Sequence, residues 1–374
     1  MIVRAAAAVD ARHINNLFTI RPTLHHSTTP TAMSSQPHPL GYESKTAHLS
    51  TGHFYRYVDI HPPQGVETIV TALLLHGFPD SAYGWRRQIK GWSSRGIRLI
   101  IPDALGYTGS SQPLDPEEYS SVRQSDDYEA LIRHVGLPEG EKIVLISHDW
   151  GAVTAIRLSQ FKPNLVKGIV SLGVPFSFAK PSPQYVPTEM LVEMLPNFGY
   201  WLFFETPESA PLLDAKLEKF ISLMFITAEQ YNTGKFPLLV KKGAIEEWLK
   251  DDTTSASPGL LSKQEFDTIV AEIKAGAGFS AMLNYYKTRK LNFELEKDLR
   301  QDYRAEMPKL LVLPIQDIAL PAELSANAEK EFTNIEVVRF EGLCGHWVQL
   351  EMAVETEKVV GEWVERMSAK GWAP

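Results

Sequence analysis

The chain has 374 residues, of which 44% are hydrophobic, and a formal net charge of −8 at pH 7. An acidic chain of this kind offers little basic surface to phosphates, which argues against a nucleic-acid-binding or anionic-membrane-binding protein. No apolar run reaches the roughly 18 residues that a membrane-spanning helix needs. The length suits one large core that carries an inserted segment. The only cysteine, Cys344, excludes an internal disulfide and indicates a reducing compartment.

Residues 1–40 differ in composition from the rest of the chain. They are rich in Ala, Ser, Thr, His and Pro, and they contain Arg4, Arg12 and Arg21 but a single acid, Asp10. Such a segment buries little apolar surface, so we expect it to be disordered. We expect this segment to be an N-terminal extension and the protein to be cytoplasmic. The alternatives are a mitochondrial targeting segment, which has the same bias, and a true start at Met33.

Short apolar runs that alternate with helical patterns predict an α/β fold. An exposed, antiparallel edge strand is predicted at 53–60. Buried strands are predicted at 68–75, 97–101, 142–146, 168–172, 309–313 and 336–340. Helical patterns such as 122–135 separate most of these runs, and this alternation predicts a mainly parallel, doubly wound sheet.

Residues 176–302 interrupt the alternation of strands and helices. They contain no convincing strand, and helices are predicted at 211–226, 236–249, 262–274 and 279–290. A helical insertion between two strands is expected to cover the carboxyl ends of the sheet, where ligands bind in open α/β folds. The predicted organisation is therefore an extension (1–40), a core (41–175 and 303–374) and a helical cap inserted in that core (176–302).

A sharp turn between a strand and a helix is predicted at Asp149. The segment from Lys142 to Val153 reads Lys-Ile-Val-Leu-Ile-Ser-His-Asp-Trp-Gly-Ala-Val, and Ser147 and Gly151 are small where a bulky side chain would collide with the turn. This is the layout of a nucleophile elbow with an aspartate at its centre. A carboxylate is ionised at neutral pH and attacks carbon directly to form an ester. An aspartate that only caps the following helix is the alternative interpretation.

Two further residues follow strands in the order that an α/β hydrolase requires. Asp317 comes after the strand at 309–313, and His346 lies in the loop after the last strand. The chain order Asp149, Asp317, His346 is therefore nucleophile, acid and histidine.

Two backbone amides are expected to form an oxyanion hole. One belongs to Phe78 in His76-Gly-Phe-Pro79, directly after the strand at 68–75, and the other belongs to Trp150. No metal-binding spacing such as H-E-x-x-H is present, so neither a metal nor a cofactor is expected.

The chain from about Gly41 to its C-terminal helix resembles the epoxide hydrolases of the α/β-hydrolase fold. The resemblance rests on His76-Gly-Phe-Pro79, Gly106-Tyr-Thr-Gly-Ser-Ser-Gln-Pro113, Ser147-His-Asp-Trp-Gly-Ala152 and Gly345-His-Trp347. It implies an AB hydrolase-1 domain with a catalytic triad and a role in detoxification or secondary metabolism.

In that family two tyrosines from the cap hold the epoxide oxygen, and the resemblance assigns these roles to Tyr200 and Tyr286. A phenol with a pKa near 10 can protonate the alkoxide that epoxide opening expels. Tyr285 is equally aromatic, and the register of the motif selects Tyr286. The segment around Tyr200 departs from the family pattern, because Trp201 stands where glutamine is frequent.

We therefore predict the hydrolysis of a small organic epoxide to a vicinal diol through an ester on Asp149. Water is the second substrate, and a monomer or homodimer without nucleic acid, membrane span or cofactor is expected. Two alternatives remain open: a haloalkane dehalogenase, against which Phe78 counts because those enzymes usually carry asparagine there, and a non-catalytic receptor for a small ligand on the same fold.

Overall fold

The structure is a computed structural model that describes residues 37–180, 182–234, 241–300 and 302–373. Most of the predicted N-terminal extension lies outside these residues, as does the start of the helix predicted at 236–249. The described residues form an eight-stranded sheet with helices on both faces and a helical insertion between its sixth and seventh strands. The predicted α/β fold with a mainly parallel sheet is confirmed.

The sheet has the strand order β1-β2-β4-β3-β5-β6-β7-β8. The pairs β1/β2 and β2/β4 are antiparallel, and all later pairs are parallel. The strands are β1 (Lys45–His48), β2 (Phe54–Ile60), β3 (Val70–Leu75), β4 (Ile97–Pro102), β5 (Ile143–His148), β6 (Val166–Leu172), β7 (Lys309–Pro314) and β8 (Ile335–Phe340). The prediction that 53–60 forms the edge is wrong, because β1 pairs outside β2.

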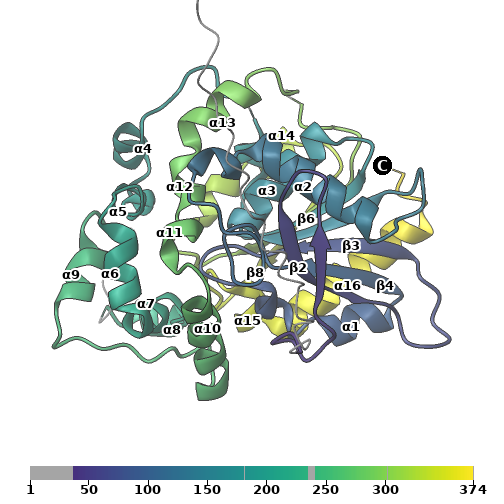
Figure 1. Cartoon of the computed structure of the whole chain (residues 1–374). Helices are drawn as coiled ribbons and strands as arrows, with labels where there is room; N and C mark the ends of the chain where they lie inside the picture. The colour runs from purple at the N-terminus through teal and green to yellow at the C-terminus, as the bar shows by residue number, and fades with distance from the viewer. Residues whose placement is uncertain (1–36, 181, 235–240, 301, 374) are drawn as a thin grey trace, which may run out of the picture. The chain divides into compact units, whose positions relative to one another are not determined.

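Neighbouring residues of the central strands bury their side chains on opposite faces of the sheet, as the period of two in a strand requires. Leu73 of β3 and Leu145 of β5 belong to the core beneath α2 and α3. Leu74 and Val144 belong to the core beneath α1 and α16. Both faces are therefore covered by helices, which explains why these strands read as continuous apolar runs (Figure 1).

The helices of the core lie outside the insertion. They are α1 (Ile89–Ser94), α2 (Ser121–His134), α3 (Trp150–Phe161), α14 (Ala328–Glu331), α15 (Val348–Glu351) and α16 (Ala353–Ala369).

The segment between β6 and β7, here called the cap, contains helices joined by loops and no strand in its described part (Figure 1). Its α-helices are α4 (Thr188–Met194), α5 (Trp201–Phe204), α6 (Ser209–Ala215), α7 (Leu217–Met224), α8 (Ala228–Asn232), α9 (Ala244–Lys250), α10 (Lys263–Ala275), α11 (Phe279–Met282), α12 (Asn284–Lys287) and α13 (Arg289–Glu296).

The cap is cut into shorter helices than the apolar pattern predicts. The helix expected at 211–226 is divided into α6 and α7, because Lys216 leaves the helical region with φ −119° and ψ 29°. The helix expected at 279–290 is divided among α11, α12 and the start of α13. The Thr288 hydroxyl donates to the carbonyl of Tyr285, a local bond that competes with helical hydrogen bonding.

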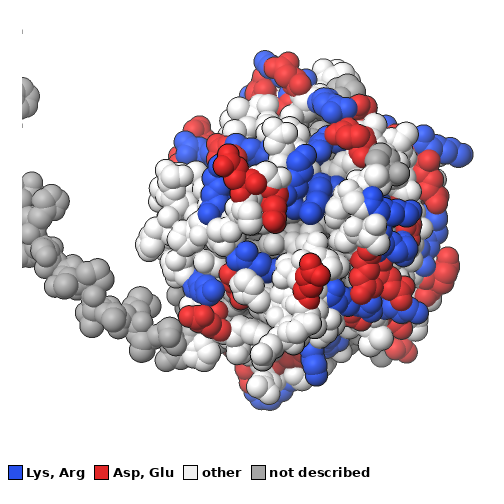
Figure 2. Space-filling view, turned by 90° about the vertical axis from the view of Figure 1, so that its right-hand side faces the viewer, with Lys and Arg blue, Asp and Glu red and all other residues white. Residues whose placement is uncertain are grey.

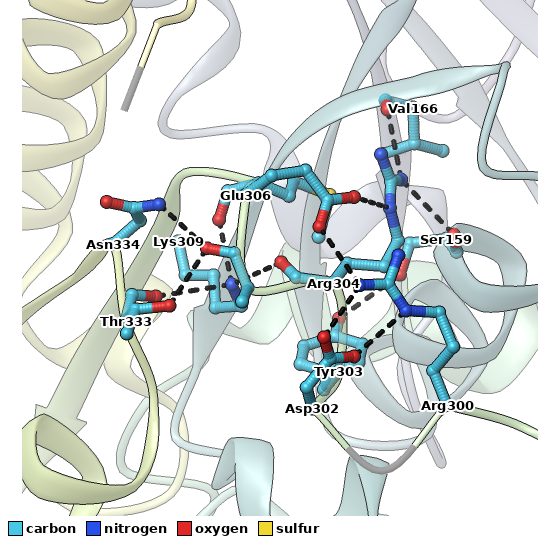
Figure 3. A network of polar contacts seen from close by, with 12 residues as sticks. Ser159, Val166, Arg300, Asp302, Tyr303, Arg304, Glu306, Lys309, Thr333 and Asn334 are labelled. Carbon is cyan, nitrogen blue, oxygen red and sulfur yellow. Dashed lines mark hydrogen bonds and ion pairs between the residues drawn. The ribbon is translucent and has the colours of Figure 1, made fainter.

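The chain returns from the cap to the sheet through a polar network (Figure 3). Arg304 donates from Nη1 to the carbonyls of Ser159 and Val166, 3.2 and 3.1 Å away, and so ties this segment to α3 and β6. Lys309, which is 1% exposed, donates from Nζ to the carbonyls of Arg304 and Met307. These bonds fix where β7 begins, and β7 ends three residues before Asp317.

Acidic and basic side chains are interspersed on the face of the molecule shown in Figure 2. Within the described residues, no helix is long and apolar enough to cross a membrane.

Candidate active site

Asp149 lies at the junction of β5 and α3, in a backbone conformation that residues other than glycine rarely adopt. Its φ is 51° and its ψ is −127°. A non-glycine residue at positive φ is strained, and such strain persists only where packing imposes it. Gly151 shows this packing, because a Cβ built there would stand 2.2 Å from the carbonyl oxygen of Leu75. The turn is therefore a strained elbow that holds the carboxylate above the strand end.

The loop after β3 forms a hydrogen bond to one oxygen of the Asp149 carboxylate. The backbone amide of Phe78 donates to Asp149 Oδ1 over 2.8 Å. A Cβ on Gly77 would stand 2.3 Å from the same Oδ1, so only glycine lets this loop approach so closely.

His346 lies between the two carboxylates that were predicted as its partners. Its Nδ1 donates to Asp317 Oδ2 over 2.9 Å, and its Nε2 stands 3.7 Å from Asp149 Oδ2. Asp317 is fully buried and also accepts the amides of Ala319 and Leu320, at 2.8 and 3.0 Å. Three residues far apart in the sequence thus meet at the carboxyl ends of β5, β7 and β8.

Burial and the neighbouring charges shift the pKa values of this triad in different directions. Burial raises the pKa of Asp149, against the opposing effect of His346 and the Phe78 amide. Burial also opposes ionisation of Asp317, but the adjacent His346 lowers the pKa of Asp317 below its usual range. For His346 burial favours the neutral ring, yet the charges of Asp317 and Asp149 prevail and raise the pKa of His346 to about 9.

Tyr200 and Tyr286 extend from the cap to the wall of the cavity that contains Asp149 and His346. Tyr200 stands immediately before α5, Tyr286 lies in α12, and their ring centroids are 6.1 Å apart. The Tyr286 ring contacts the edge of Trp150, at 5.1 Å between centroids. Tyr285 points elsewhere, because its hydroxyl donates to the carbonyl of Leu105 in the core over 3.0 Å.

Two chambers meet at Asp149 and Tyr200, which line both of them. The smaller chamber, of about 60 Å³, also has Tyr286, His346 and Phe78 in its wall. The larger chamber, of about 370 Å³, extends beneath α4, α5 and α13 and includes Trp201 in its wall. The larger volume is in the range of ligand-sized pockets.

Comparison with known proteins shows the family to which the chain belongs. The model of the family described as the alpha/beta hydrolase fold matches residues 72–353. The chain is 32% identical over 328 residues to epoxide hydrolase srdG of Neurospora crassa, and the alignment covers 85% of this chain and 93% of that protein. The chain belongs to the epoxide-hydrolase family of the α/β-hydrolase fold.

Other members of the epoxide-hydrolase family match over a similar span. Bifunctional epoxide hydrolase 2 of Rattus norvegicus is 29% identical over 297 residues, covering 78% of this chain and 51% of that protein, so the chain spans about half of that relative's length. The crystal structure of epoxide hydrolase A from Mycobacterium thermoresistibile superposes with a TM-score of 0.69 at 26% identity, covering 86% of this chain and 97% of that one.

In this family member, Glu351 fixes the loop that carries His346. Its Oε1 accepts the amides of Gly345 and Trp347, at 3.1 and 3.2 Å, which flank the histidine on both sides. Burial raises the pKa of Glu351. Sequence reasoning missed this residue. The signal that could have found it is an acid that lies five residues after the predicted catalytic histidine and on the first turn of a helix.

His148, which precedes Asp149 in the elbow, also supports His346 through a hydrogen bond. Burial lowers the pKa of His148 to about 3, so its ring is neutral. Its Nε2 donates to the carbonyl of His346 over 2.9 Å, and its Nδ1 accepts from Gln349 over 3.3 Å. These contacts make His148 a hydrogen-bonded support for the loop of His346. Apart from Asp149, Trp150, Tyr200 and the unusual Trp201, the wall residues of the larger chamber carried no sequence signal.

Proposed function

We propose that this protein hydrolyses a small organic epoxide to a vicinal diol through an ester on Asp149. The observation that carries the proposal is the position of the Asp149 carboxylate, which has the Phe78 amide on one oxygen, His346 near the other, and two phenols in the wall of the same cavity. This arrangement supplies a nucleophile, a base and proton donors within one site. Family membership supports the same reaction class.

In the first step a carboxylate oxygen of Asp149 forms a bond to one epoxide carbon as the bond from that carbon to the ring oxygen breaks. The departing alkoxide takes a proton from Tyr200 or Tyr286. Burial, followed by the nearby Tyr200 and Asp149, raises the pKa of Tyr286 well above 10, so the phenol is protonated when substrate arrives. A proton delivered at this moment turns a poor leaving group into an alcohol.

In the second step His346 removes a proton from water, which attacks the ester carbonyl of Asp149. The amides of Phe78 and Trp150 hold the resulting oxyanion. As the acyl–oxygen bond breaks, His346 returns its proton to the departing oxygen and the diol is released. Asp149 is left as a carboxylic acid, and transfer of its proton to the tyrosinate of the first step restores the carboxylate and the phenol. Esterification removes the negative charge of Asp149, which is one of the charges that raise the pKa of His346. The ester itself therefore prepares His346 to act as a base.

Haloalkane dehalogenation is the alternative enzymatic reaction. It would use the same Asp149 nucleophile, but the departing halide would need no proton from the tyrosines. A screen of terminal and internal epoxides against chloroalkanes and bromoalkanes, with diol and halide as readouts, separates the two reactions. Diol release without halide release is expected. Halide release alone would replace the proposal by dehalogenation, and tight epoxide binding without turnover would favour a receptor.

A further inference from the structure

The two cap tyrosines that line the smaller chamber are held in place by different means. Tyr286 is 2% exposed, and its ring packs against those of Phe204 and Trp150, at 4.9 and 5.1 Å between centroids. Tyr200 is only partly buried, and it lines both the smaller and the larger chamber. Because its ring borders both cavities, side-chain packing fixes Tyr200 less firmly than it fixes Tyr286.

The backbone that carries Tyr200 has little helical support of its own. A 3-10 helix of three residues, Pro196–Phe198, precedes the tyrosine, and the four-residue helix α5 follows it. Helices this short are marginal by themselves and depend on tertiary contacts. The position of the phenol therefore depends on what holds this segment against the core.

A hydrogen bond joins this segment to the loop of Asp317. The side-chain amide of Asn197, in the 3-10 helix, donates from Nδ2 to the carbonyl of Ile318 over 2.7 Å. Phe198, the next residue, is 3% exposed and belongs to the same apolar cluster as Leu320. Two neighbouring residues of the cap thus contact the turn that follows Asp317.

The turn after Asp317 is already fixed by hydrogen bonds of its own. Asp317 Oδ1 accepts the amides of Ala319 and Leu320, which closes the turn around the carboxylate. The hydrogen bond from Asn197 to Ile318 therefore constrains the cap segment more than it constrains the acid. Its loss should displace Tyr200 and leave Asp317 in place.

We propose that Asn197 is a positioning residue that holds the Tyr200 phenol against the leaving oxygen of the epoxide. This inference rests on the proposed function and adds a residue to the first step of that reaction. Tyr200 stands three residues after Asn197, so a shift of the 3-10 helix moves the phenol with it. Proton transfer needs hydrogen-bond distance, and a misplacement of about 1 Å slows it. Hydrolysis of the ester by His346 should proceed unchanged.

The test measures the two chemical steps separately, with 1,2-epoxyhexane and styrene oxide as probes. In the His346→Gln background the Asp149 ester should accumulate, so mass spectrometry of the intact protein over time gives the rate of alkylation. Asn197→Leu removes the donor at similar volume and should slow alkylation by about three- to tenfold, as expected for one hydrogen bond. In proteins that retain His346, the decay of the ester after a single turnover should keep its wild-type rate.

A double-variant cycle shows whether Asn197 acts through Tyr200. Asn197→Leu should slow alkylation where the phenol is present, but not in Tyr200→Phe, where no phenol is left to position. A general loss of packing would slow both proteins alike. Equal slowing in the two backgrounds would therefore overturn the inference.

Asn232 provides a matched control. Its Nδ2 donates to Gln316 Oε1 over 2.8 Å, so it also joins the cap to the loop of Asp317, but from α8 and not from the segment of Tyr200. Asn232→Leu should leave the rate of alkylation unchanged. If it slowed alkylation as much as Asn197→Leu does, any loosening of the cap would suffice, and the role assigned to Asn197 would be wrong.

The outcomes separate this inference from the proposed reaction. Absence of the ester in His346→Gln, with Asn197 intact, would overturn the reaction and the inference with it. Ester that forms at the same rate in Asn197→Leu would overturn the inference alone. Urea unfolding checks that the leucine variant is folded. If it is not, Asn197→Ala replaces it with the same expectations, because alanine removes the donor and adds no bulky apolar group.

Discussion

Asp149 and Asp317 flank the same histidine, yet their environments assign them different tasks. Asp317 is fully buried and accepts two amides and the ring N–H of His346, which lower the pKa of Asp317 although burial opposes this. Burial dominates at Asp149 and raises its pKa. In the proposed mechanism the Asp317 carboxylate is thus held as an anion that orients the ring, while the Asp149 carboxylate is less strongly stabilised as an anion and so better suited to attack.

Replacement of His346 by glutamine should separate the two chemical steps. A carboxylate needs no base to attack, so the His346→Gln variant should form the Asp149 ester but fail to hydrolyse it. Mass spectrometry of the intact protein should show an adduct of one equivalent of epoxide.

The same experiment has an isotopic counterpart in the wild-type enzyme. A single turnover in heavy-oxygen water should leave the label in the Asp149 carboxylate, since water attacks the ester carbonyl. As a control for the adduct experiment, a variant that combines His346→Gln with Asp149→Ala should form no adduct. Label that appears only in the diol would mean that water attacks the substrate directly.

The phenol groups of Tyr200 and Tyr286 should matter for catalysis more than for folding. Tyr200→Phe and Tyr286→Phe should each lower epoxide turnover, and the double variant should lose most of a general-acid contribution of about 10²–10⁴-fold. Tyr285→Phe is the matched control, because its hydroxyl bonds to Leu105 outside the cavity. Full epoxide activity in the double variant would show that these tyrosines only pack.

Site residues differ in how far local sequence reveals them. Asp149, Phe78 and His346 follow strands within short motifs, so the sheet order carries them to one edge and their meeting could be predicted. Asn197 and Ile318 become neighbours only through the path of the cap, which no short motif encodes. Their contact could not be foreseen from the sequence.

At the scale of elements, buried strands were predicted better than cap helices. Strands β3 and β5 are apolar on both faces and bounded by turns, so composition alone marks them. The cap helices α11 and α12 have four residues each, and tertiary contacts decide where each one ends. The strand β1 was missed because Lys45–His48 is short and polar.

Lys309 at the start of β7 should contribute to stability through its hydrogen bonds and not through its charge. In Lys309→Met the carbonyls of Arg304 and Met307 would lose their donor, and the free energy of unfolding should fall by about 1–3 kcal/mol (Figure 3). Urea unfolding measures this change. Unchanged stability would mean that water replaces the amine without cost.

The pH dependence of the same variant isolates the charge of Lys309. Burial lowers the pKa of Lys309 in the folded protein to about 8, whereas an unfolded lysine has a pKa of about 10.4. Between these values the unfolded chain binds a proton that the folded chain does not, so this residue makes stability rise with pH from about 8 to 10. The Met variant should lack that rise.

Across the whole molecule, ion pairs join the cap to the core. Arg56 of β2 bonds to Asp103 at the end of β4, over 2.6 Å, and also to Glu272 of cap helix α10. Arg86 bonds to Glu265 of the same helix over 2.6 Å. These partly buried pairs place α10 above the loop that follows β3, and so help to set the position of the cap over Asp149.

Asp103 at the centre of this network should make the folded molecule sensitive to acid. Burial opposes its ionisation, but Arg56 and His38 prevail and hold the pKa of Asp103 well below its usual range. Above about pH 5 both the folded and the unfolded chain carry this charge, and its stabilising effect is complete. As the pH falls further, the unfolded chain takes up a proton that the folded chain refuses, and stability is lost.

Urea unfolding of wild type, Asp103→Asn and the surface control Asp298→Asn between pH 6 and pH 3 measures this linkage. The wild type and Asp298→Asn should lose about 1 kcal/mol more than Asp103→Asn over that range, because only they retain the carboxylate whose pKa differs between the folded and unfolded chain. Asp103→Asn should be less stable than wild type at pH 6, since it leaves Arg56 without its buried counter-ion. Parallel curves for all three proteins would show that the pKa of Asp103 is the same in the folded and the unfolded chain, and that acid unfolding begins elsewhere.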